Sequence, residues 1–160
     1  MALSEYEPTK KLSYGLVSGI IGGLAMLPGL IMMEVETEND GKMSMLESLS
    51  LMMGDKDLLM GLLIHMMVAI IYGVIFGVVI LLYVSQFGKE HPNLVQSVGI
   101  GLVYAVVLQI IAAMGMMVMP SEIDPDANDM LILFLGQFMG HLVYGAVTGL
   151  AYSLLNEYVG

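Results

Sequence analysis

The sequence predicts an all-α membrane protein with four transmembrane helices, and three observations lead to that prediction. Of the 160 residues, 58% are hydrophobic and only 12% are charged, and the mean hydropathy is +0.84. A water-soluble globular domain is excluded, because so apolar a chain would expose too much hydrophobic surface to water. Four stretches of the sequence carry no charged side chain, and each is longer than the ~20 residues that a helix needs to cross a ~30 Å hydrocarbon core. These stretches cover residues 12–33, 58–88, 91–121 and 130–156.

We expect one membrane domain over residues 1–160, with Asp57 and Asp129 as N-caps of the second and fourth helices. Residues 43–54, in the long loop before the second helix, place apolar side chains at helical spacing. This stretch either lies in the interface plane of the membrane or forms a short connector helix packed on the bundle. The four membrane helices should cover approximately residues 12–33, 58–84, 94–119 and 130–155.

Four spans place both chain termini on the same side of the membrane. That side carries three of the five lysines, namely Lys10, Lys11 and Lys89. Lysines near the ends of the spans favour the cytoplasmic side, whereas acids contribute little to orientation. We therefore expect a multi-pass protein of the cell membrane with both termini in the cytoplasm and the acidic loops 34–57 and 121–129 outside.

Similarity between helices indicates an internal repeat. Residues 15–17, Gly-Leu-Val, recur as residues 101–103, and residues 72–77, Tyr-Gly-x-x-x-Gly, recur as residues 144–149. Because each half contains two spans, both halves enter the membrane from the same side. The sequence therefore predicts two similar helical hairpins related by an axis along the membrane normal, which is a parallel repeat.

Glycines recur at intervals of four or five residues in three of the expected spans. In lipid, such small residues let helix backbones approach closely, so we interpret the glycines as helix-packing positions. The alternative is that they line a permeation path. The predicted packing positions are Gly15, Gly19, Gly23, Gly73, Gly77, Gly136, Gly140, Gly145 and Gly149.

Two histidines fall within spans, where an ionisable group suggests a functional site because its burial in hydrocarbon is costly. Neutral imidazoles could hydrogen-bond between helices and fix their register, which is the interpretation we favour. A path for protons or small solutes and a metal or haem site are the alternatives. The predicted intramembrane cluster consists of His65, Tyr72, Gln109, Gln137, His141 and Tyr144.

The chain has 17 methionines and no cysteine. Methionine thioethers can bind copper(I), so the weak metal candidates are His65, His141, Met114 and Met117. Methionine also fills irregular gaps between helices because it is flexible and apolar, and we favour that interpretation. We therefore expect no cofactor, with copper or haem as the alternative.

The sequence contains no phosphate-binding loop, dinucleotide fingerprint, serine elbow or zinc-protease motif, so we do not expect an enzyme. A net charge of −10 argues against nucleic acid as a partner. The hypothesis is a non-catalytic integral membrane subunit that associates with other membrane proteins or with itself. A small transporter or channel that uses the His/Gln cluster is the alternative, and a copper- or haem-binding membrane protein is the third.

The glycine-rich spans and the pattern His141-x-x-Tyr144-Gly145-x-x-x-Gly149 in the last helix resemble small four-span membrane proteins of prokaryotes, including archaea, whose function is uncharacterised. This resemblance covers one helix and the overall layout. It implies a four-span fold and assigns no functional residue.

Overall fold

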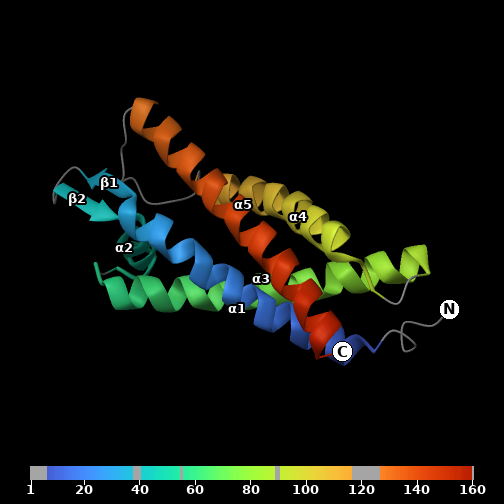
Figure 1. The fold of residues 1–160 in the computed structure, drawn as a ribbon. Coiled ribbons are helices and arrows are strands. Elements are labelled where there is room, and N and C mark those ends of the chain that lie inside the picture. Colours follow the sequence, from blue (N-terminus) through green and yellow to red (C-terminus); the bar gives the residue numbers. More distant parts are fainter. Residues whose placement is uncertain (1–6, 38–40, 55, 89–90, 117–126, 160) are drawn as a thin grey trace.

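Four long helices dominate the fold (Figure 1). The computed structural model describes residues 7–37, 41–54, 56–88, 91–116 and 127–159. All four helices are long and apolar enough to cross a membrane, so the prediction of four helices of membrane-spanning length is confirmed. Their bounds are α1 Pro8–Met32, α3 Leu58–Phe87, α4 Leu94–Met116 and α5 Ala127–Tyr158.

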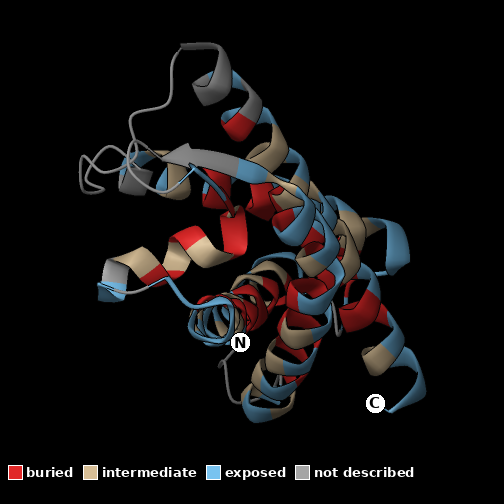
Figure 2. Ribbon diagram, turned by 90° about the vertical axis from the view of Figure 1, so that its left-hand side faces the viewer, coloured by how far each residue is buried: buried red, intermediate tan, exposed pale blue. Residues whose placement is uncertain are grey.

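The start of α1 and the end of α5 lie at the same end of the bundle, which we call the terminus end (Figure 1). At the opposite end, which we call the loop end, a small antiparallel hairpin and the short helix α2 connect α1 to α3. Helix α1 packs against both α3 and α5, whereas α4 packs against α5 and makes few contacts with α3. Buried residues accordingly gather on the facing sides of the helices (Figure 2).

The helix ends follow ordinary capping chemistry. Asp57 is the N-cap of α3, as predicted, and its carboxylate accepts a 2.8 Å hydrogen bond from the backbone N–H of Met60. Gly88 ends α3 in the left-handed conformation, φ +63°. The prediction for Asp129 is wrong, because α5 already begins at Ala127 and Asp129 lies within its first turn.

The loop end contains a β-hairpin that the sequence analysis missed. Strands β1 (Glu34–Thr37) and β2 (Gly41–Ser44) pair antiparallel, and α2 covers Met45–Ser50 with a 3-10 turn at Leu51–Met53. The helix expected over residues 43–54 therefore begins only at Met45. A capping box explains this start, because the Ser44 hydroxyl accepts from the backbone N–H of Glu47 while the Glu47 carboxylate accepts from that of Ser44.

Helix α2 packs on α3 as a connector. Leu46 is only 1% exposed, and its carbonyl group lies directly against Gly61 of α3. Ser48 and Ser50 are buried and donate to backbone carbonyls of α2. Ser50 also accepts from the backbone N–H of Asp57 at 2.9 Å, which fixes α2 against the start of α3.

An aromatic core joins the four long helices towards the terminus end. Phe76 and Tyr152 are both fully buried, and their rings meet edge to face with centroids 5.8 Å apart. Tyr14 lies against Tyr152 at 6.2 Å, and Tyr104 lies against Phe76 at 5.6 Å. These four rings come from four different helices, so the aromatic packing fixes the bundle as one unit.

Candidate functional site

Helices α1 and α3 touch backbone to backbone. A Cβ added to Gly15 would lie 2.5 Å from the carbonyl oxygen of Gly73 and 2.7 Å from the Cα of Gly77. One turn further on, a Cβ on Gly19 would lie 2.7 Å from the carbonyl oxygen of Ala69. Only glycine permits these approaches, because the blocking atoms belong to the opposing backbone and cannot move aside.

Helices α4 and α5 form a second contact of the same kind. Gly145 lies against the backbone of Gly101, and a Cβ added to it would also come within 2.7 Å of the Ala105 Cβ. A Cβ on Gly149 would lie 2.8 Å from the carbonyl carbon of Ser97. Gly101 is missing from the predicted packing positions, although its similarity to Gly15 in the proposed repeat was the signal that could have identified it.

The contact between α1 and α5 is different, because side chains fill it. The thioether of Met26 reaches Gly140, and that of Met33 reaches Gly136. Gly22, which the four-residue pattern also missed, faces the ring of Tyr144. Methionine thus occupies the space that glycine leaves, in line with its expected role as a gap filler.

His65 connects α3 to α1. Its Nε2 lies 3.0 Å from the backbone carbonyl oxygen of Gly23, and only 8% of the residue is exposed. Since a carbonyl oxygen can only accept, Nε2 carries the proton and donates it. The imidazole therefore holds two membrane helices together through a backbone group that no substitution removes.

His141 connects α5 to α4. Its Nδ1 lies 2.8 Å from Gln109 Oε1 and 3.0 Å from the carbonyl oxygen of Gln137, one turn earlier in α5. Both partners accept, so Nδ1 is the protonated nitrogen. His141 also lies close enough to His65 for electrostatic interaction. The structure thus brings both histidines and both glutamines of the predicted cluster into one region of the bundle.

The tyrosines near this region also bond to backbone carbonyls of other helices. The Tyr144 hydroxyl donates to the carbonyl oxygen of Ala69 in α3 at 3.0 Å. Tyr104, which the sequence analysis missed, donates from α4 to the carbonyl oxygen of Tyr72 at 2.9 Å. Tyr72 contributes its carbonyl oxygen to this bond, while its side chain lines a groove between α3 and α4.

Two side-chain atoms of the cluster have no hydrogen-bond partner among the residues that the structure describes. They are Gln109 Nε2, a donor, and Gln137 Oε1, an acceptor, and both atoms are buried. Such atoms are costly in an apolar surrounding. The neighbourhood of His141 therefore retains unused hydrogen-bonding capacity within the membrane span.

Three of the four metal candidates fall within the described part of the chain. No group of three or more His, Cys, Asp or Glu side chains that could hold a metal ion occurs there. Met114 is 59% exposed on α4, and Met117 lies outside the described residues. His65 and His141 each use one ring nitrogen in hydrogen bonds to another helix.

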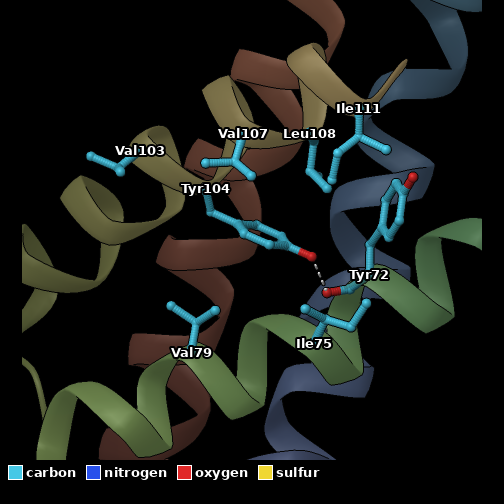
Figure 3. A pocket seen from close by; sticks show the side chains of 8 residues that line it. All are labelled: Tyr72, Ile75, Val79, Val103, Tyr104, Val107, Leu108 and Ile111. Carbon is cyan, nitrogen blue, oxygen red and sulfur yellow. Dashed lines mark hydrogen bonds between the residues drawn. The ribbon is translucent and has the colours of Figure 1, made fainter. Parts of the chain in front are cut away.

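An apolar groove of about 320 Å³ runs between α3 and α4 (Figure 3). Tyr104 and Leu108 form its buried floor, at 7% and 2% exposure, and the bond from Tyr104 to the Tyr72 carbonyl crosses it. The groove is where α4 fails to close against α3. Its lining residues are Tyr72, Ile75, Val79, Val103, Tyr104, Val107, Leu108 and Ile111.

Four apolar spans and a hydrogen-bonded polar cluster among them define the chain as a helical membrane protein of the multi-pass class. No protein-family model matches the chain, and neither a curated protein nor a solved structure gives a significant match.

Proposed function

We propose that the protein is a non-catalytic integral membrane subunit, which works as part of a larger membrane complex or as a homo-oligomer. One observation carries this proposal: both histidines and two tyrosine hydroxyls inside the spans form hydrogen bonds to another helix. His65 bonds to the backbone of α1, and Tyr104 and Tyr144 bond to the backbone of α3. Groups held in this way stabilise the architecture.

The apolar surface supports association within the bilayer. Large hydrophobic side chains are exposed along all four spans, including Leu24, Leu63, Val103 and Leu150. Such surface is covered by lipid hydrocarbon or by other membrane helices. A small bundle with this much open surface therefore has room for partner subunits or for further copies of itself.

Purification from native membranes in a mild detergent tests the proposal. We expect a stoichiometric protein partner by quantitative mass spectrometry, or a defined homo-oligomer by native mass spectrometry. A monomer without partners that carries a solute across liposome membranes would contradict the subunit role and favour the alternative below.

We also propose the internal repeat, on the basis of helix contacts at corresponding positions. With residue i in α1 aligned to i+86 in α4, and residue i in α3 aligned to i+72 in α5, the close contacts of one pair correspond to those of the other. Proteins with such repeats arise when one hairpin is duplicated. The corresponding contacts are Gly15 with Gly73 and Gly77, and Gly101 with Gly145 and Gly149.

The same alignment accounts for the groove. Gly22 of α1 faces Tyr144 of α5, and the residues that correspond to them are Leu108 and Tyr72, which both line the groove. Leu108 of α4 occupies the position that corresponds to Gly22 of α1, and its side chain keeps α4 away from α3. The two halves therefore differ at the position where one contact closes and the other stays open.

For orientation we propose a cell-membrane protein whose termini face the cytoplasm and whose loop end faces outward, on the basis of the lysine distribution. The chain has no cysteine, so a single introduced cysteine is a unique label site. Met53→Cys, at an exposed position of the loop end, should react with an impermeant maleimide in intact cells. Reaction only after permeabilisation would reverse the orientation.

A second candidate function is a small transporter or channel, and the unpartnered amide atoms of Gln109 and Gln137 beside His141 favour it. In that case His141→Gln would fold normally and abolish pH-dependent flux in liposomes, because an amide does not protonate near neutral pH. Flux that is absent in the wild-type protein, or unchanged in His141→Gln, would remove this candidate.

A further inference from the structure

We propose that the groove between α3 and α4 is a binding site for one hydrocarbon chain of a membrane lipid. The groove lies near the middle of α4, around Val107, and therefore at hydrocarbon depth when the four helices span a membrane. Its floor is buried, whereas its rim is open: Val107 is 47% and Ile75 is 43% exposed. A ligand can thus enter sideways from the bilayer (Figure 3).

The lining favours an acyl chain over a second helix. At the close helix contacts of this protein, a glycine admits the neighbour, as Gly15 does for α3 and Gly101 does for α5. The groove offers none of the small residues that allow helix backbones to approach, because its wall and rim carry β-branched side chains such as Ile75, Val79 and Val107. A thin flexible chain needs no such close approach.

The size of the groove suits a hydrocarbon chain. The groove holds about 320 Å³. An apolar cavity of ~150 Å³ is known to accept a benzene-sized molecule, and a space about twice that volume suits a stretch of hydrocarbon chain.

Hydrogen bonding in the groove is compatible with a purely apolar ligand. The Tyr104 hydroxyl already donates to the carbonyl oxygen of Tyr72, so a hydrocarbon chain that covers Tyr104 does not leave this hydroxyl without a partner. The bond also keeps the tyrosine ring across the floor, where it presents an apolar face to the ligand (Figure 3). Burying a flexible chain there removes the void that α3 and α4 leave between them.

Two tryptophan substitutions on adjacent residues of α4 test the proposal. Val107→Trp fills the groove, whereas Val106→Trp is the matched control, because Val106 is similarly exposed, at 43%, but does not line the groove. Each protein is reconstituted in nanodiscs of palmitoyl-oleoyl phosphatidylcholine and then transferred to mild detergent. Native mass spectrometry then measures the phospholipid that remains bound and the number of protein copies.

We expect wild-type protein and Val106→Trp to retain one phospholipid and Val107→Trp to lose it, with the same number of protein copies in all three. Equal retention by both variants, or no retention by the wild type, would overturn the lipid site. Loss of a protein copy in Val107→Trp alone would instead assign the groove to a helix partner. If Val107→Trp fails to fold, Ile75→Trp on the α3 wall gives the same comparison. The subunit role is tested separately by co-purification, so the two proposals can fail independently.

Discussion

Gly15 and Gly73 each place a carbonyl oxygen where the side chain of the other would begin. A Cβ on Gly15 would lie 2.5 Å from the Gly73 oxygen, and a Cβ on Gly73 would lie 2.6 Å from the Gly15 oxygen. Because neither position tolerates even a methyl group, the two residues fix the depth at which α1 and α3 cross.

Alanine substitutions test this crossing. Gly15→Ala and Gly101→Ala should each destabilise the protein by about 1–3 kcal/mol, because overpacking forces backbones apart. Gly99→Ala in α4 is the control, since its Cβ would meet nothing within 4 Å. It should raise stability, because alanine favours a helix over glycine by up to ~1 kcal/mol. Equal thermal unfolding temperatures for the three variants would contradict the packing.

Tyrosine hydroxyls in the spans should contribute differently to the stability of the protein, according to whether they have a hydrogen-bond partner. Tyr144→Phe removes the bond to the Ala69 carbonyl and should cost ~0.6 kcal/mol, and no more than ~1.7 kcal/mol. The buried hydroxyl of Tyr152 has no partner among the described residues, so Tyr152→Phe should be neutral or stabilising. Tyr158→Phe, at a residue 77% exposed, serves as the surface control. Denaturant titration of all three variants in one detergent measures their free energies of unfolding. A larger loss of stability in Tyr152→Phe than in Tyr144→Phe would refute the prediction.

The role of His65 in joining α3 to α1 can be separated from proton chemistry. His65→Gln keeps a donor for the Gly23 carbonyl and should be tolerated, whereas His65→Leu should destabilise by about 0.5–2 kcal/mol. His91→Leu is the control, because His91 is exposed between α3 and α4. A glutamine variant that folds and assembles normally but loses flux, bound metal or partner binding would show that His65 does more than hold helices.

The capping box at the loop end should respond to pH. Hydrogen bonds from the Ser44 backbone N–H and hydroxyl hold the pKa of the Glu47 carboxyl below its ordinary value. The capping bonds therefore stabilise α2 fully above that ordinary value, and this contribution disappears as the pH falls through the lowered pKa. In a carbon-13 NMR titration, Ser44→Ala should raise the pKa of Glu47, while Ser48→Ala, which removes a hydroxyl that donates to the Met45 carbonyl, should not. An unchanged Glu47 titration in Ser44→Ala would contradict the capping role.

The sequence predicts the membrane helices well because each span must by itself be apolar over the thickness of the bilayer. It also identifies Asp57 as a cap, since capping depends on residues only three apart. The β-hairpin is missed because its register depends on a turn, whereas the acidic residues from Glu34 onward look like a solvated loop. The groove is missed because the distance between α4 and α3 depends on tertiary packing, which no short sequence pattern indicates.

The sequence predicts which residues belong to the candidate cluster, but it does not predict which hydrogen bonds they form. Polar residues are rare in the spans, so His65, Gln109 and His141 stand out by type alone. Which acceptor each one uses depends on tertiary packing: His65 bonds to a backbone carbonyl of α1, which no side-chain pattern encodes. Tyr104 is missed for the same reason, because its partner is the backbone of Tyr72 rather than a polar side chain.

The methionine contacts between α1 and α5 have a mechanical consequence. Where α1 meets α3, and where α5 meets α4, rigid backbone lies against rigid backbone, so each pair has one fitting register. Where α1 meets α5, the flexible thioethers of Met26 and Met33 lie against Gly140 and Gly136 and can change rotamer as the helices shift. The seam between α1 and α5 can therefore adjust locally at these two methionines, while the aromatic core and the bond from Tyr144 to the Ala69 carbonyl still hold the two helix pairs together.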